Sequence, residues 1–198
     1  MNSDHRSFDE PPYNRPRQQA EPFGSSAAAI DALAAVGPDQ DRADGLQLFG
    51  QFVGSWDVEI TYFDVEGHVE EQRPAEWHFG WVLEGRAVQD VLFGPPVAER
   101  RRTGAPAREY GTTIRMYDPR SDVWHASWFA PVRSVVVHLA GGRDGDAIVL
   151  EGTELDGTRC RWMFSDITSD SFLWSGYEGS DADVQRPLVQ QMKARRTR

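Results

Sequence analysis

The sequence predicts an all-β protein, an antiparallel up-and-down barrel of about eight to ten strands with a short N-terminal helix and a disordered N-terminal tail. Three observations lead to this fold class. Turn signals recur at short intervals after residue 56, among them Glu66-Gly67 and Asp118-Pro119. Polar and apolar residues alternate between these turns. Where a strand carries one of the seven tryptophans, the tryptophan face is at least as apolar as the opposite face.

The first 44 residues are expected to precede the folded domain. Residues 1–24 are rich in proline, glutamine, asparagine and charge, so they bury too little surface to offset the entropy lost on ordering, and we expect them to be disordered. Residues 25–36 are alanine-rich and compatible with a short helix, which is marginal by itself. A linker follows. The predicted domains are therefore a tail and linker over 1–44 and a barrel over 45–198.

The first strand is expected over residues 56–63, where Trp56, Val58 and Ile60 alternate with polar residues. This pattern is typical of an antiparallel strand with one wet face. One or two helical turns over 46–54 would lead into it. The other predicted strands are 68–84, 86–93, 110–117, 123–130, 133–140, 146–152, 158–164, 171–179 and 186–195.

A helix is the alternative over residues 68–84, because Trp77 and Trp81 are four residues apart. Pro74 and Gly80 disfavour that helix, since both residue types weaken a helix interior. We therefore expect a strand there.

The segment WHFGWVLEGRAVQD (77–90) is expected to form a hairpin with a two-residue turn at Glu84-Gly85. Residues opposite each other in a hairpin share a face, so this register places Arg86 and Asp90 on the tryptophan side. A slip by one residue would expose both. A buried charge without a partner is very costly, so each would need a protein partner or a ligand. For Arg86, a rim position that reaches solvent is the alternative.

The composition disfavours several function classes. The net charge of −10 argues against nucleic acid, which binds basic surfaces. The single cysteine, Cys160, excludes an internal disulfide framework, and no cysteine–histidine cluster predicts a zinc site. No segment reaches the roughly 18 apolar residues of a membrane helix, and no signal-peptide pattern opens the chain. We expect a cytoplasmic protein without metal, cofactor or membrane contact, and a homodimer is compatible with the sequence.

Aromatic residues on the inner faces predict a cavity for a small molecule. A barrel of about eight to ten strands encloses either a packed core or room for one small ligand. Tryptophan is rigid, bulky and polar at one point, so it suits a cavity wall, with packing in the core as the alternative. The expected ligand-binding residues are Tyr62, Trp77, Phe79, Trp81, Arg86, Trp124, Trp128, Trp174 and Gln190.

Two other features carry hypotheses. Among the five histidines, only His138 could be a haem ligand inside the barrel, and a surface or rim position is the alternative. The loop 95–110 carries Arg100, Arg101, Arg102 and Arg108 in an acidic protein. It is either a solvated loop or a cap that attracts an anionic ligand to the open end of the barrel.

Gly54-Ser55-Trp56 fits the Gly-x-Trp pattern that opens the first strand of lipocalins and their calycin relatives. Residues 46–196 resemble a bacterial lipocalin-like family of uncharacterised function, most clearly in EWHFGWVLEGRAVQD, YGTTIRMYDPRSDVW and QQMKARR. The resemblance implies a barrel with one open end and a small-molecule cavity. It also implies that Trp56 closes the base and that Arg195 or Arg196 packs on it. Secreted lipocalins have a signal peptide and paired cysteines, which this sequence lacks.

Two functions are compatible with these observations. The first is binding of a small hydrophobic or aromatic metabolite in the barrel cavity. The second is a cofactor-independent cyclase, isomerase or lyase that acts on a polyketide-like or phenolic substrate there. Asp90 and Glu178 are the candidate catalytic residues for the second function, because burial raises a carboxyl pKa toward the range useful for proton transfer. The sequence leaves both functions open.

Overall fold

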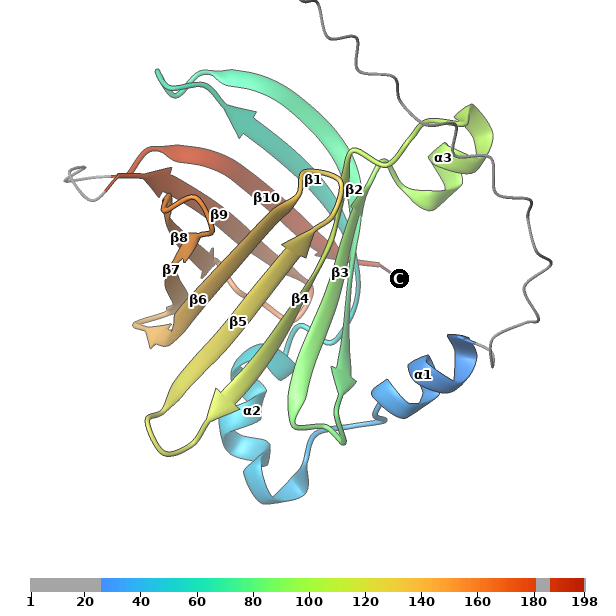
Figure 1. The fold of residues 1–198 in the computed structure, drawn as a ribbon, viewed down its shortest axis with the longest axis vertical. Helices are drawn as coiled ribbons and strands as arrows, with labels where there is room; N and C mark the ends of the chain where they lie inside the picture. The colour runs from blue at the N-terminus through green and yellow to red at the C-terminus, as the bar shows by residue number, and fades with distance from the viewer. Residues whose placement is uncertain (1–25, 181–185, 198) are drawn as a thin grey trace, which may run out of the picture. The chain divides into compact units, whose positions relative to one another are not determined.

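The computed structural model describes residues 26–180 and 186–197, and within them it confirms the predicted fold class. Ten antiparallel strands form one closed barrel in which each strand pairs with its neighbours in sequence and β10 closes on β1 (Figure 1). The strands are β1 (Gly54–Phe63), β2 (Val69–Val82), β3 (Ala87–Gly94), β4 (Glu109–Asp118), β5 (Val123–Ala130), β6 (Val135–Asp144), β7 (Ala147–Glu154), β8 (Arg159–Ser165), β9 (Ser171–Gly179) and β10 (Leu188–Arg196).

The described helices are short: α1 (Ser26–Leu33), α2 (Ala43–Gly50) and α3 (Val97–Thr103), with a 3-10 turn, η1 (Gln40–Arg42). None of them is long and apolar enough to cross a lipid bilayer. The chain divides into two units, Met1–Ala32 and Leu33–Arg198, and the barrel lies in the second. The tail predicted to be disordered, residues 1–24, lies outside the described residues. The domain boundary near residue 45, the cytoplasmic location and the homodimer stay predictions.

One end of the barrel is closed by α2 and the residues that follow it (Figure 1). Leu46, Phe49 and Phe52 are almost completely buried and fill this end. Phe49 meets the ring of Trp124 edge-on with centroids 4.8 Å apart, and Phe52 lies 4.7 Å from the ring of Phe172. The helix is too short to be stable alone, so we attribute its stability to this burial.

The Gly-x-Trp motif lies at this closed end. The indole Nε1 of Trp56 donates to the carbonyl oxygen of Phe52 at 2.7 Å. This hydrogen bond links the segment that follows α2 to β1. The guanidinium carbon of Arg196 lies 4.1 Å from the centroid of the Trp56 ring. A Cβ at Gly54 would lie 2.6 Å from Arg196 Nη1, so the glycine leaves room for the arginine. Of the two candidate arginines, Arg196 therefore packs on Trp56.

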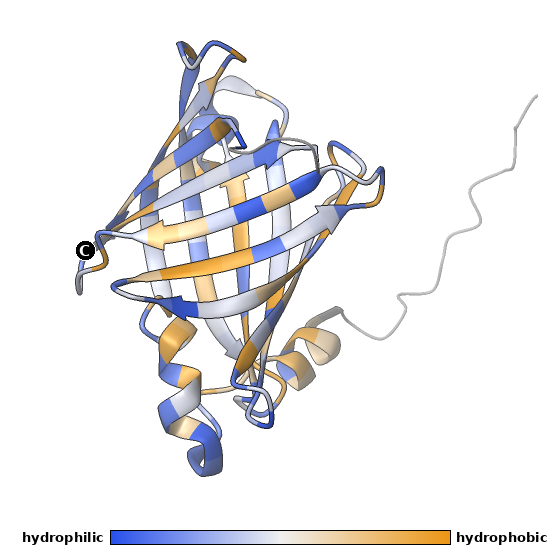
Figure 2. Ribbon diagram, turned by 90° about the vertical axis from the view of Figure 1, so that its left-hand side faces the viewer, coloured by the Kyte–Doolittle hydropathy of each residue, from blue (hydrophilic) through white to orange (hydrophobic). Residues whose placement is uncertain are grey.

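The strands alternate hydrophilic and hydrophobic residues, as Figure 2 shows. In β4 the more apolar face is the outer one. Tyr110 and Met116 are exposed, whereas Glu109, Thr113 and Arg115 are buried inside the barrel. The expectation that the more apolar face of a strand points into the barrel is therefore wrong for β4. The reason lies in its neighbours, because the inner residues of β4 pair with charged and polar groups from other strands.

Candidate functional site

The hairpin between β2 and β3 has the predicted register but a longer turn. Phe79 is opposite Asp90, as expected, and the ladder ends at the pair Val82 and Ala87. Residues 83–86 form the turn, and the first three of them have positive φ angles of 54°, 58° and 78°. A Cβ at the third, Gly85, would also lie 2.2 Å from a backbone oxygen, so only glycine fits.

The prediction that Arg86 faces inward is wrong, because this residue belongs to the turn and not to the strand. Its side chain is 55% exposed. Its Nε donates to the carboxylate Oδ2 of Asp39 at 2.8 Å, in the segment before α2. Arg86 is therefore a surface residue that holds this segment to the hairpin turn.

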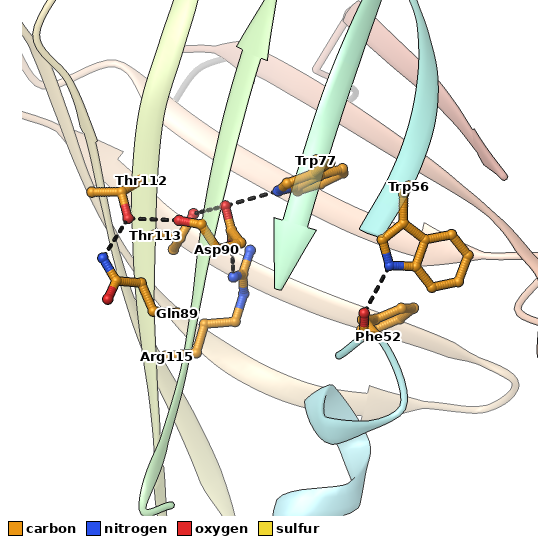
Figure 3. Close-up of polar contacts among 8 residues, drawn as sticks. All are labelled: Phe52, Trp56, Trp77, Gln89, Asp90, Thr112, Thr113 and Arg115. Carbon is orange, nitrogen blue, oxygen red and sulfur yellow. Dashed lines mark hydrogen bonds and ion pairs between the residues drawn. The ribbon is translucent and has the colours of Figure 1, made fainter. Parts of the chain in front are cut away.

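Asp90 does face inward, and it is only 1% exposed. Its Oδ1 accepts a hydrogen bond from Trp77 Nε1 at 2.8 Å and a longer one from Thr113 Oγ1 at 3.4 Å (Figure 3). Its Oδ2 forms an ion pair with Nη1 of Arg115. None of these partners is Tyr62, Glu178 or Gln190 of the predicted site. Asp90 thus lies behind the residues that line the cavity, and both of its carboxylate oxygens have partners there.

Arg115, the partner of Asp90, was missed by the sequence analysis. It is completely buried, and its guanidinium carbon lies 5.1, 5.6 and 5.8 Å from the ring centroids of Phe49, Phe79 and Phe164. Nε and Nη2 have no hydrogen-bond partner among the described residues. The pairing of β3 with β4 would have identified Arg115. An inward aspartate needs a cation, and Arg115 is on the same face of β4, two residues along the strand from Thr113, which pairs with Asp90.

A cavity lies on the other side of this ion pair. It has about 500 Å³ of empty space, part of which is open to solvent. Its aromatic wall consists of Trp77, Trp128, Trp162 and Trp174. Its polar lining consists of Glu109, Thr113, Arg133, Glu154, Glu178 and Gln190.

Three of the tryptophans form walls at steep angles to one another. The rings of Trp128 and Trp162 are inclined at 74° with centroids 6.3 Å apart, and those of Trp162 and Trp174 at 71° and 5.4 Å. Two glycines make room for them. A Cβ at Gly111 would lie 2.4 Å from Trp128, and one at Gly176 would lie 2.5 Å from Trp174. Larger residues at either position would push an indole out of its place in the cavity wall.

Glu109, at the start of β4, has partners inside the protein. The hydroxyl of Tyr62 donates to its Oε2 at 2.7 Å, and Nη2 of Arg133 lies 3.3 Å from its Oε1. Burial, followed by the nearby Glu109 carboxylate, raises the pKa of Tyr62. The phenol therefore stays protonated and acts as a donor. Glu109 and Arg133 offset each other's charge beside the cavity.

Glu154, Cys160 and Glu178 form a second group, in which the carboxylate oxygens and the thiol lie within 4.8 Å of one another. Burial, and then neighbouring carboxylates, raise the pKa of Glu178 and of Glu154. The same causes raise the pKa of the Cys160 thiol to about 12. Each residue could offer one atom to a metal ion. A thiol that holds its proton so firmly is a poor ligand and a poor nucleophile.

Two residues that line this cavity have a buried donor without a partner among the described residues. The donors are Nε1 of Trp174, a residue only 4% exposed, and Nε2 of Gln190 on the neighbouring strand. Buried donors in folded proteins are nearly always hydrogen-bonded, so each one without a partner needs an explanation. A bound molecule with acceptor atoms would supply it.

The structure brings some predicted site residues together and separates others. Five line the cavity: Trp77, Trp128, Trp174, Glu178 and Gln190. Tyr62 reaches the site through its hydrogen bond to Glu109. Phe79, Trp81 and Trp124 belong to the aromatic core. Phe79 contacts Phe52 and Trp124 contacts Phe49, the two phenylalanines that fill the closed end. Trp81 packs on Gly50 of α2.

The aromatic and charged lining residues that the prediction left out are Trp162, Glu109, Arg133 and Glu154. Trp162 could have been found, because it alternates with Cys160 and Phe164 on one face. Glu109 and Glu154 are the terminal residues of β4 and β7, and Arg133 lies in the turn before β6, where alternation gives no orientation.

The hypotheses on His138 and on the arginine-rich loop also have structural answers. His138 is exposed on the outer face, with Nδ1 3.0 Å from Ser127 Oγ, so it is not an inward haem ligand. The loop contains α3, at the end of the barrel opposite α2 (Figure 1). None of its four arginines lines the cavity, so the cavity lining does not support the hypothesis of an arginine-rich cap.

No family model and no curated protein matches the sequence. Two solved structures have a similar fold. Rv2717c from M. tuberculosis has a TM-score of 0.56 and 14% identity, over 79% of this chain and 99% of that one. The S-type phycobiliprotein lyase CPES from Guillardia theta has a TM-score of 0.53 and 12% identity, over 81% and 99%. The shared fold is a closed barrel of antiparallel strands. At this level of identity the likeness is one of fold alone.

Proposed function

We propose that this protein binds a small hydrophobic or aromatic molecule in the cavity at the open end of the barrel. One observation carries the proposal: Trp174 and Gln190, which line a cavity walled by tryptophan, each have a buried donor without a partner among the described residues. A packed core would not leave this space, and buried donors in folded proteins nearly always have a partner. Such a pocket, mostly apolar with a few convergent polar groups, is the usual form of a ligand site.

The size of the cavity limits what can enter. Its empty space is about 500 Å³, which includes the part open to solvent. Ligand pockets usually have about 300–1,000 Å³, so this one is at the low end of that range. We infer that the ligand is small or inserts one compact group, with the rest of it lying toward the mouth.

An enzyme that uses the same cavity is the second candidate, and the raised pKa of Glu178 favours it. A half-buried carboxyl with a raised pKa beside an apolar pocket is suited to general acid–base catalysis. Asp90 is a weaker candidate, because it is buried behind the lining and paired with Arg115. The lyase from Guillardia theta has a barrel of the same fold, which makes catalysis in such a barrel plausible without identifying a reaction.

The test of binding is calorimetric titration of the full chain with small aromatic probes: benzyl alcohol, benzaldehyde, phenol and indole. We expect saturable binding of at least one probe that carries an acceptor. Trp174→Phe keeps a ring but removes the N–H, and should weaken that binding about two- to tenfold, the value of one net hydrogen bond. Trp124→Phe at the closed end is the matched control and should leave the affinity unchanged. Absence of saturable binding across the panel would contradict the proposal.

A further inference from the structure

The charges that face the cavity do not balance. Glu109, Glu154 and Glu178 line it, and Arg133 is the one cationic side chain among the described lining residues. Arg133 already pairs with Glu109 at 3.3 Å. Among the described residues no arginine, lysine or histidine forms an ion pair with Glu154 or Glu178, although both are partly buried. The charge of Arg133 acts on both carboxyls from a distance, but burial outweighs it. The cavity thus has two carboxyl groups without an ion-pair partner among those residues.

The aromatic wall beside these carboxyls has the geometry of a cage. Trp128, Trp162 and Trp174 stand at 74° and 71° to their neighbours, as adjacent walls of a box do. The face of an indole carries negative charge density, and a cation near several such faces is stabilised by each of them. Aromatic cages of this type bind quaternary ammonium groups. The carboxyl groups and the indole faces therefore both favour a cation as the ligand.

The open donors give an independent restriction on the ligand. Nε1 of Trp174 and Nε2 of Gln190 are both hydrogen-bond donors without partners. A bare cation would leave them unsatisfied. A ligand that satisfies the site must therefore carry an acceptor, such as a hydroxyl or carbonyl oxygen, close to its charged group.

We infer that the ligand of this cavity is a small organic cation, a quaternary ammonium or protonated amine with a nearby hydroxyl or carbonyl oxygen. Its charged head lies among Trp128, Trp162 and Trp174 and faces Glu154 and Glu178, while its oxygen accepts from Trp174 Nε1. The inference rests on the proposed binding function and names the ligand class.

Other ligand classes fit less well. An anion would meet two unneutralised carboxyls and the negative faces of the indoles. A neutral apolar molecule would leave both carboxyls buried against it with no compensation. A divalent metal would engage only Glu154, Cys160 and Glu178, where the thiol holds its proton, and would leave the aromatic cage unused.

The titratable groups around the charged head of the ligand predict how the binding affinity depends on pH. Tyr62 on β1 and Cys160 on β8 have raised pKa values and stay neutral near pH 7, while Arg133 stays charged. Burial raises the pKa of Glu154 and Glu178 more than the charge of Arg133 lowers it. These carboxyls therefore ionise only at a pH above the ordinary glutamate range. Affinity for a cation whose charge does not titrate should rise with pH through that range.

Choline and 3,3-dimethyl-1-butanol test the inference, because they have the same shape and hydroxyl and differ only in charge. Calorimetric titration of the full chain at pH 7.5 should show choline binding at least about tenfold more tightly than the alcohol, as expected for a cation beside carboxylates and indole faces. Choline affinity should fall as the pH is lowered toward 4.5, while the affinity of the alcohol stays constant.

Two isosteric variants locate the charge effect. Glu178→Gln and Glu154→Gln should each weaken choline binding about tenfold and leave the alcohol unaffected. Glu151→Gln is the matched control. It removes the same charge from the outer face of β7, where Glu151 lies 3.7 Å from Arg161, and should not change either affinity.

The possible results separate this inference from the proposed function. If the alcohol or a neutral aromatic probe binds as tightly as choline, the cation inference is overturned and the binding function stands. If Glu178→Gln and Glu154→Gln both leave choline affinity unchanged, or if Zn²⁺ binds and choline does not, the inference is also overturned. If neither choline nor any neutral probe binds, both proposals fall.

Discussion

The two ends of the barrel interior combine tryptophans with ionised side chains, but they treat the charges differently. At the closed end, Asp90 and Arg115 neutralise each other in a position without solvent, and Trp77 and Thr113 complete the carboxylate's hydrogen bonds. At the open end, Glu154 and Glu178 pair with no cation among the described residues, and the N–H of Trp174 has no acceptor among them. The carboxyl group is paired with a cation at one end and not at the other, although Nε and Nη2 of Arg115 also have no partner among these residues.

This difference separates stability from function. Groups that satisfy one another inside the protein contribute to a defined core and need nothing from outside. Groups left unsatisfied beside a cavity cost stability and persist where a ligand completes them. Changes at the closed end should therefore alter the free energy of unfolding, whereas changes at the open end should alter binding more than folding.

The largest effect is expected for Asp90→Asn. It removes the charge opposite Arg115, which would then be a buried cation among three phenylalanine rings without compensation. We expect a loss of about 3–5 kcal/mol in the free energy of unfolding, the usual result of breaking a buried ion pair. Urea denaturation followed by tryptophan fluorescence measures it.

The double variant Asp90→Asn with Arg115→Met is the control for this interpretation. It removes both charges and should recover part of the loss. If Asp90→Asn instead leaves the unfolding midpoint unchanged and abolishes ligand binding, Asp90 belongs to the site, and the contrast between the two ends is wrong.

An intermediate effect is expected for Gly176→Ala in β9. The added methyl group would lie 2.5 Å from the Trp174 ring, so the indole must move toward Trp162. We expect a loss of about 1–3 kcal/mol in stability, as for other overpacked positions, and a weaker probe affinity. Gly80→Ala, where nothing lies within 4 Å of the new Cβ, is the matched control in β2. Equal effects of the two substitutions would show that backbone entropy, rather than the cavity wall, is responsible.

The smallest effect is expected for Arg86→Ala at the hairpin turn. This removes an exposed ion pair with Asp39, which is worth less than about 1 kcal/mol in most proteins. Probe affinity should be unchanged, because the side chain lies outside the barrel. A large loss of affinity in a calorimetric titration would show that the turn communicates with the cavity.

The fold class followed from local patterns. Alternation in β1 and the spacing of turn residues predict antiparallel strands, and an even succession of such strands closes most simply into a barrel. The pairing of Phe79 with Asp90 also followed, since the turn placed at Glu84-Gly85 sets the register of the hairpin. The site was predicted only in part. Tryptophans on clear strand faces were found, and groups at strand ends were missed.

The sequence by itself determined the strands, most of their inner faces and the inward position of Asp90, because these depend on neighbours within one hairpin. Only the tertiary structure decided which inner residues pack and which line a cavity. The turn length exposed Arg86, and the pairing of β3 with β4 brought Arg115 to Asp90. Glu154, Cys160 and Glu178 come from three strands that meet only when the barrel closes. A burial pattern read along one strand contains no information about charges supplied by the others.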